Sequence, residues 1–346
     1  MGHVTDFVKE RISTDKLTLA NYVSTENMKS DFGGINPAIS IPNNTNVIHY
    51  KKGDVLLSNI RPYLRKVWAA NSDGGCSTDV FVFRAKSISP SFLHYIMAND
   101  TFINYVMSGA KGVKMPRGDK EQMLKYVFSI PRIEEQYKIS RLLHLLDDRI
   151  ATQNKIIEDL KKLKSAISER FFTSINGDVV TLADICDIVK GKQVNGEFLT
   201  DSGNYYVMNG GIEPSGYYDD YNTEANTISI SEGGNSCGYV QFNTTPFWSG
   251  GHCYTIQNIT NNVEKLYLYH YLKCNEDTIM KLRIGSGLPN IQKKDLAKFR
   301  VIVPIIEQQK TISAFLSLLE RKVQVETDIL IAVQSEKQYL LRQMFI

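Results

Sequence analysis

The chain carries a long internal repeat whose two copies lie half its length apart. Residues 130–136 (IPRIEEQ) reappear as residues 303–309 (VPIIEQQ), 173 positions further along a chain of 346 residues. The offset holds without a gap through Phe171 and Phe172, which match Met344 and Phe345. Self-similarity over this distance, in a chain longer than one typical domain, predicts two copies of one fold.

After the proline of each copy the sequence predicts a long helix, over residues 131–173 and 304–346. Apolar residues recur there at alternating spacings of four and three, the heptad pattern of a coiled coil. The seam positions are Ile139, Leu143, Leu146, Ile150, Ile157 and Leu160 in the first copy and Ile312, Leu316, Leu319, Val323, Leu330 and Val333 in the second. An ordinary packing hairpin would explain one such run, but two matched copies favour a spacer.

Two seam positions hold lysines, Lys164 and Lys337, in matching places of the two copies. If the helices pair antiparallel, Lys164 lies near Glu320 and Lys337 lies near Asp147. A lysine can lay its stem along apolar surface and extend its charge to the edge. We therefore predict two symmetric ion pairs that fix the register of the helices.

The segments before the two helices, residues 1–130 and 174–303, are predicted to be globular. Strand-like runs occur at residues 54–57, 80–83, 127–130, 227–230, 253–256 and 300–303, and helical runs at 92–106 and 266–283. The repeat extends weakly into both segments, since Ser58 matches Ser231 and Val67 matches Val240. The predicted class is α+β, with two similar α/β domains separated by two long helices that form an antiparallel coiled coil.

Charge is informative through its distribution, because a net charge of +3 is too small to indicate a nucleic-acid partner. Cations gather in corresponding loops among Ser, Asn, Gln and Gly, a mixture that suits DNA: cations bind phosphates, and arginines and amides read base edges. A solvated basic face usually explains one such cluster, but matching clusters in both copies favour DNA. The candidate DNA-binding residues are Lys51, Ser58, Asn59, Arg61, Arg65, Lys66, Lys111, Lys114, Arg117 and Lys120 in the first half and Lys190, Lys192, Gln193, Ser231, Asn235, Lys281, Arg283, Ser286, Asn290, Lys293 and Lys294 in the second.

No catalytic or metal site is expected in this chain. Its five cysteines are not spaced as zinc or redox pairs, so we expect reduced thiols. The glycine-rich residues 233–238 lack a P-loop ending, and residues 245–248 only faintly resemble the catalytic loop of adenine methyltransferases. Because no leader or membrane-length apolar run is visible, we expect a cytoplasmic protein without a membrane partner.

With these features the chain resembles the specificity subunits of Type I restriction-modification systems along essentially its whole length. The most specific elements are residues 130–136 and 303–309, each closing a variable domain and opening a long helix. Residues 285–291 also resemble a loop near the end of the family's target-recognition domains, with residues 112–117 as the first-half counterpart.

The resemblance implies two target-recognition domains at opposite ends of an antiparallel helical spacer, which bind double-stranded DNA. It also implies two modification subunits that methylate adenine with S-adenosylmethionine, and restriction subunits driven by ATP and Mg²⁺. No cofactor would belong to this chain itself. Three alternatives stay open: a specificity partner of a methyltransferase without a restriction subunit, a self-sufficient methyltransferase, and a coiled-coil scaffold or adhesion protein with two similar binding domains.

Overall fold

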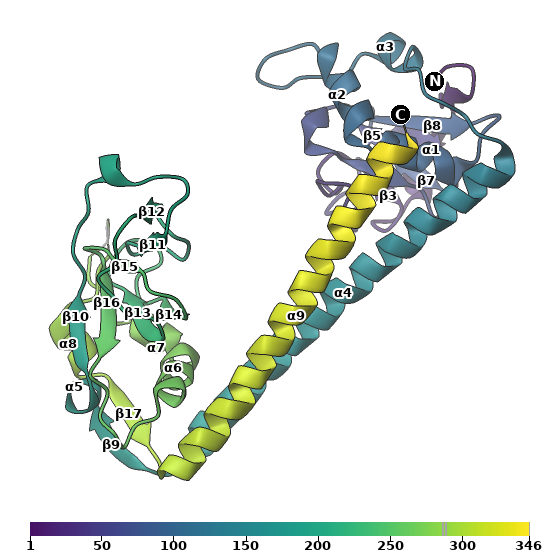
Figure 1. The fold of residues 1–346 in the computed structure, drawn as a ribbon. Helices are drawn as coiled ribbons and strands as arrows, with labels where there is room; N and C mark the ends of the chain where they lie inside the picture. The colour runs from purple at the N-terminus through teal and green to yellow at the C-terminus, as the bar shows by residue number, and fades with distance from the viewer. Residues whose placement is uncertain (286, 288, 346) are drawn as a thin grey trace. The chain divides into compact units, whose positions relative to one another are not determined.

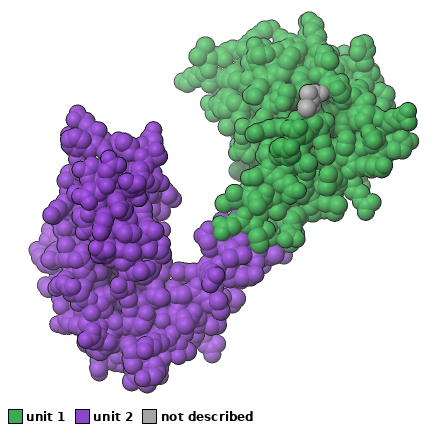
Figure 2. All heavy atoms as spheres, in the orientation of Figure 1, with its two compact units in different colours: residues 1–154, 328–346 green, residues 155–327 purple. Residues whose placement is uncertain are grey.

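The computed structural model describes the whole chain except Ser286, Leu288 and Ile346, and it divides into two compact units. Unit 1 comprises residues 1–154 and 328–346, and unit 2 comprises residues 155–327 (Figure 2). Each unit consists of a globular domain and portions of the two longest helices, α4 (Ile133–Ser174) and α9 (Ile306–Met344), which lie side by side (Figure 1). The predicted class, two α/β halves with two long paired helices, is confirmed.

The domain of unit 1 is built on an antiparallel sheet with the strand order β1-β8-β5-β6. Its strands are β1 (Thr5–Phe7), β5 (Val55–Ser58), β6 (Val67–Ala69) and β8 (Val80–Ala85). A second sheet contains β2 (Arg11–Ser13), β3 (Tyr22–Val23), β4 (Asn46–Tyr50) and β7 (Gly74–Cys76). The helices are α1 (Pro90–Met97), α2 (Asp100–Ser108) and α3 (Lys120–Leu124), with a 3₁₀ turn at Pro62–Leu64. The apolar runs of β5 and β8 are buried, as their sequences predict.

The domain of unit 2 repeats this main sheet in the same order, β10-β16-β13-β14. Its strands are β10 (Asp187–Lys190), β13 (Thr227–Ser231), β14 (Val240–Asn243) and β16 (Cys253–Gln257), followed by α6 (Lys265–Cys274), α7 (Glu276–Met280) and α8 (Lys293–Ala297). Smaller sheets contain β11 (Tyr205–Met208), β12 (Tyr217–Tyr218) and β15 (Trp248–Ser249), and β9 (Asp178–Thr181) with β17 (Arg300–Val303); α5 spans Leu182–Ile185. Strands β14 and β16 begin 173 residues after β6 and β8, so the repeat continues through the domains.

Two local predictions were wrong, and both errors have a physical cause. The strand predicted at residues 127–130 is absent, whereas its counterpart β17 pairs with β9. In unit 1, residues 2–4 form a turn instead of a partner strand. Each predicted domain helix is also two helices, because Asn99 and Asn275 interrupt them. The Asn99 side chain accepts a hydrogen bond from the Thr101 N–H and so caps α2.

Within each unit some residues of the predicted seam are buried. Leu143 in unit 1 and Leu316 in unit 2 are fully buried. The predicted ion pairs are confirmed: the Lys337 ammonium bonds the Asp147 carboxylate in unit 1, and the Lys164 ammonium bonds the Glu320 carboxylate in unit 2.

A tyrosine hydroxyl also donates to each of these carboxylates. In unit 1 the Tyr95 hydroxyl lies 2.8 Å from an oxygen of Asp147, and in unit 2 the Tyr269 hydroxyl lies 3.1 Å from an oxygen of Glu320. Both tyrosines belong to the first helix of their domain, α1 or α6. The carboxylate that pairs with the seam lysine therefore also ties the domain of its own unit to the long helices.

The last glutamine of each repeated motif, Gln136 or Gln309, is a buried connector that the sequence did not reveal. In unit 1 the Gln136 amide oxygen accepts from the Ser89 N–H at 2.8 Å, and its amide nitrogen donates to the Pro131 carbonyl at 2.9 Å. Gln309 does the same with the Glu264 N–H and the Pro304 carbonyl, at 2.8 and 2.7 Å. The motif thus fastens the start of each long helix to the start of α1 or α6.

Candidate nucleic-acid interface

In unit 1 two loops that carry predicted residues are joined through their backbones at the end of β5. The Arg61 N–H donates to the Pro116 carbonyl at 2.8 Å, and the Gly118 N–H donates to the Asn59 carbonyl at 3.3 Å. Lys111 and Arg117 exchange two backbone hydrogen bonds of 2.9 Å. Two segments some fifty residues apart in sequence are thereby brought into one platform, which we define as residues 58–61 and 111–118.

Unit 2 builds the equivalent platform, residues 231–234 together with residues 284, 285, 287 and 289–291, with the same backbone bonds. The Gly234 N–H donates to the Pro289 carbonyl at 2.9 Å, and the Ile291 N–H donates to the Glu232 carbonyl at 2.8 Å. Ile284 and Asn290 exchange hydrogen bonds of 2.8 and 3.0 Å. Each participant lies 173 positions after its counterpart in unit 1, so the two platforms are copies that carry different side chains.

The other predicted residues of unit 1 differ in their distance from the platform along the fold. Lys51 precedes β5 and so lies at the opposite end of that strand from Ser58. Arg65 and Lys66 follow the 3₁₀ turn that begins after Arg61, and Lys120 opens α3 directly after the platform. Lys51 is therefore the weakest candidate of this group.

The predicted residues of unit 2 gather around its platform in four segments. Lys190 ends β10 and contacts the platform through Glu232, while Lys192 and Gln193 follow on the next loop. Lys281 and Arg283 precede residue 284, Asn235 follows residue 234, and Lys293 and Lys294 open α8. The side chains of Lys281, Arg283, Lys293 and Lys294 lie at the surface around residue 284 and at the start of α8. Ser286 lies outside the described residues.

Most predicted cations of unit 1 already have a partner within the unit. Lys51 lies 3.3 Å from Glu10, Arg65 lies 3.1 and 2.9 Å from Asp31 and Asp100, Lys111 lies 2.7 Å from Asp119, and Arg117 lies 2.9 Å from Asp79. The Lys66 ammonium donates to the Thr25 carbonyl, and that of Lys120 lies 4.8 Å from the centre of the Phe81 ring. Within the described part of the chain, Arg61 and Lys114 form no ion pair.

Glu232 is a carboxylate on the platform of unit 2 that was not among the residues predicted from the sequence. One of its oxygens accepts from the Lys190 ammonium at 2.6 Å and from the Tyr254 hydroxyl at 3.0 Å. The other oxygen lies 3.6 Å from Nδ1 of His252 and has no hydrogen-bond partner. Burial raises the pKa of Tyr254, which keeps its hydroxyl protonated. Only its position at the end of a buried strand could have drawn attention to Glu232.

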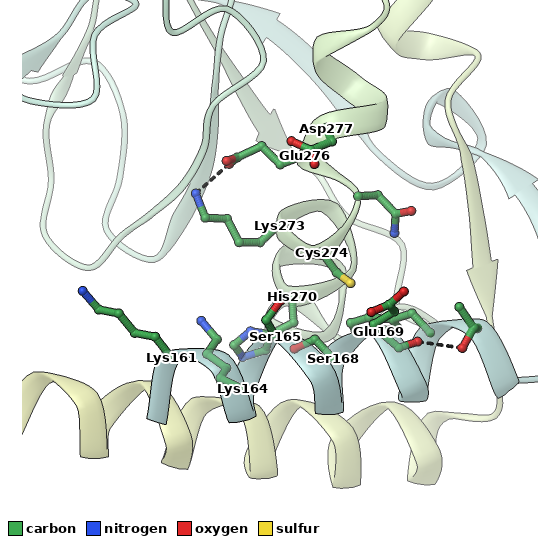
Figure 3. A pocket seen from close by; sticks show the side chains of 13 residues that line it. Lys161, Lys164, Ser165, Ser168, Glu169, His270, Lys273, Cys274, Glu276 and Asp277 are labelled. Carbon is green, nitrogen blue, oxygen red and sulfur yellow. Dashed lines mark hydrogen bonds and ion pairs between the residues drawn. The ribbon is translucent and has the colours of Figure 1, made fainter. Parts of the chain in front are cut away.

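One cavity of unit 2 is an alternative candidate site, but its lining does not favour nucleophilic chemistry. It has a volume of about 690 Å³ and lies between α4 and the α6–α7 pair. Figure 3 shows both positively charged lysines and negatively charged carboxylates around it, and the Lys273 ammonium lies 2.6 Å from a carboxylate oxygen of Glu276. Burial raises the pKa of the Cys274 thiol on its wall, which disfavours the nucleophilic thiolate.

Neither a metal centre nor a membrane span is found among the described residues. No group of three or more His, Cys, Asp or Glu side chains there is arranged to hold a metal ion. None of the helices in the same residues is long and apolar enough to cross a membrane.

Comparison with known proteins assigns both halves to one family. A family model described as the Type I restriction modification DNA specificity domain matches residues 9–162 and again residues 176–335. A putative type I specificity subunit from Mycoplasma pneumoniae is 32% identical over 154 residues, and one from Mycoplasma genitalium is 31% identical over the same length. Each match covers 44% of this chain, and 41% and 40% of the two relatives.

Solved structures show the same fold over the full chain. The crystal structure of a Type I restriction-modification S subunit from M. genitalium matches with a TM-score of 0.74 at 17% identity, covering 100% of this chain and 94% of that one. A chain from a study of complex assembly in the type I system matches with a TM-score of 0.60 at 20% identity, covering 99% and 95%.

Proposed function

Because this chain belongs to the Type I restriction modification DNA specificity family and is built as a specificity subunit, we propose that it recognises a double-stranded DNA target made of two different half-sites. The observation that carries the proposal is the pair of platforms, which share their backbone bonds and differ in their side chains. Loops of this kind can present side chains to base edges while neighbouring cations bind phosphates.

The differences between the platforms favour two different half-sites over a palindrome. Arg117 in unit 1 corresponds to Asn290 in unit 2, and Asn59 corresponds to Glu232. Arginine suits guanine and asparagine suits adenine, so an exchange of one for the other changes the base that is read. Residues 1–130 and 174–303 would then be the target-recognition domains, and residues 131–173 and 304–346 the spacer between them.

We further propose that this chain recognises DNA and that partner subunits react with it. Two modification subunits would methylate adenine with S-adenosylmethionine, and restriction subunits would use ATP and Mg²⁺. One chain of similar fold comes from work on complex assembly in the type I system, and the two matched halves of this chain offer two equivalent places for the same partner. A protein that acts on cellular DNA in this way would be cytoplasmic.

The direct test is methylation of a duplex library by the full chain assembled with its modification subunits. We expect a target of two defined parts separated by unspecified bases. Arg117→Ala should weaken discrimination in one half-site only, and Arg283→Ala in the other only, each by about 1–3 kcal/mol if the side chain contacts a base. A single continuous target, or variants that affect both parts equally, would contradict the proposal.

Salt dependence separates DNA recognition from the scaffold alternative. Neutralised phosphates release counterions, so the logarithm of the DNA-binding constant should fall linearly with the logarithm of the salt concentration. A scaffold that binds a protein through apolar surface would show no such slope with duplex DNA. Duplex binding by the full chain at several salt concentrations measures this.

A further inference from the structure

Two arginines of unit 1 hold a backbone conformation that favours glycine. Arg61 has φ 50° and ψ 62°, and Arg65 has φ 54° and ψ 41°, both in the left-handed region. The residues 173 positions later in unit 2 are Gly234 and Gly238, with φ of 77° and 94°. Because a side chain is strained in this region and glycine is not, unit 1 keeps arginine at two places where glycine would cost less.

The strain at Arg65 has an explanation inside the fold. Its guanidinium lies 3.1 Å from Asp31 and 2.9 Å from Asp100, which connects the 3₁₀ turn to the start of α2. These ion pairs would be lost if glycine stood there. Arg65 therefore serves as the internal control for Arg61.

The strain at Arg61 has no such explanation. Its side chain is half-buried and forms no ion pair in the part of the chain that the structure describes. Its Nε is buried without a hydrogen-bond partner, as is the side-chain oxygen of Asn59 two residues earlier. Buried polar atoms without partners cost free energy, so these contacts of the Arg61 side chain do not stabilise the folded domain.

The surroundings of Arg61 hold it in one place at the platform. Its N–H donates to the Pro116 carbonyl at 2.8 Å, and its carbonyl accepts from the Leu64 N–H at 2.9 Å. Pro62 follows directly and restricts the backbone further. These bonds fix the backbone from which the Arg61 side chain extends, so little backbone freedom is lost when the side chain binds a ligand.

We propose that Arg61 reads a guanine in the half-site bound by unit 1, a contact that unit 2 lacks because Gly234 stands at the same place. The inference rests on the proposed DNA recognition and adds the base and the residue. A guanidinium can donate two parallel hydrogen bonds to O6 and N7 of guanine. A phosphate contact would not require a strained position, because an unstrained lysine on the same loop could supply it.

The test compares three variants of the full chain, assembled with its modification subunits, on a library of duplex targets varied at each position. Arg61→Gly installs the unit 2 residue and removes the strain, so its urea unfolding midpoint should be equal to or above that of the wild type. Its preference for one G·C pair should fall by about ten- to a hundredfold. Arg61→Lys keeps the charge but not the two-pronged geometry, so it should retain overall affinity and lose the same preference.

Arg65→Gly is the matched control. It also relieves a left-handed arginine, but it removes the ion pairs with Asp31 and Asp100, so it should unfold at lower urea than the wild type. The inference is overturned if Arg61→Gly destabilises the domain, if it weakens binding to all sequences evenly, or if Arg61→Lys restores base preference. A wild-type complex without any sequence preference would instead refute the proposed function itself.

Discussion

The buried glutamine of the second repeated motif, Gln309, provides a sharp test of how each domain is fastened to its long helix. Its amide oxygen accepts from the Glu264 N–H at 2.8 Å. Its amide nitrogen donates to the carbonyls of Asn262 and Pro304, at 2.9 and 2.7 Å. Because Gln309 is fully buried, water cannot replace these bonds. Gln309→Met keeps the length of the side chain and leaves three backbone groups without partners.

The magnitude follows from the number of groups left unpaired. A buried donor or acceptor that loses its partner costs about 1–3 kcal/mol, and the greater hydrophobicity of methionine offsets part of the loss. We expect Gln309→Met to lower the free energy of unfolding by about 3–5 kcal/mol. In unit 1, Gln136 has two such bonds, to Ser89 and Pro131. Gln136→Met should therefore cost about 1 kcal/mol less.

The chain offers one tryptophan in each unit to follow these effects separately by fluorescence, Trp68 in unit 1 and Trp248 in unit 2. Urea unfolding in a Trp68→Phe background reports on unit 2, where Gln309→Met should lower the midpoint. The matched control is Gln308→Met, because Gln308 is the exposed neighbour on the same helix. Equal stabilities of the two methionine variants would refute the role given to the buried amide.

Three further predictions concern the long helices and the residues packed on them. Replacement of Lys337 by Met and of Asp147 by Asn, singly and together, should give a coupling free energy of about 1 kcal/mol in a double-mutant cycle. The absence of coupling would show that the ion pair does not stabilise the fold. Burial lowers the pKa of His270 from its ordinary value of 6.5 to about 4. The unfolded chain therefore binds more protons between these values, and the free energy of unfolding falls as the pH drops from 6.5 to 4. His270→Gln should lessen the fall between pH 7 and pH 4 by about 3 kcal/mol, measured by urea unfolding at both values, and an unchanged fall would contradict the assignment. Finally, a heptad inserted into both long helices adds about 10 Å to each. It should lengthen the unspecified part of the target by about three base pairs. Methylome sequencing that finds an unchanged spacing would refute the idea that the length of the helices sets it.

The helical seam could be predicted from the sequence because its pattern is local. Apolar spacing within one helix determines which residues face the partner, and counting inward from the two ends determined the pairing of Lys164 with Glu320. The role of Gln309 could not be predicted in the same way. It stands in the first turn of a helix, where a polar residue is usually exposed, and its partners Asn262 and Glu264 lie on a loop about 45 residues away.

The candidate interface shows the same division between local and distant information. Residue type and clustering were enough to nominate Arg61 and Arg65 together. Only the fold separates them, because the partners of Arg65, Asp31 and Asp100, lie 34 and 35 positions away in opposite directions along the chain. The break in each domain helix at Asn99 or Asn275 was missed because the apolar pattern continues across it.

The two platforms suggest how one duplicated fold can acquire two specificities without loss of stability. Backbone groups make the bonds that hold each platform: the Asn59 N–H donates to the Asp79 carbonyl at 2.8 Å, and the Glu232 N–H donates to the His252 carbonyl at 2.9 Å. Such bonds do not depend on the type of side chain that a residue carries, so side chains there can change while the loops stay joined. The exception is a left-handed position, where only glycine is free of strain. An arginine at such a position, as at residue 61, is therefore better explained by binding than by the stability of the folded domain.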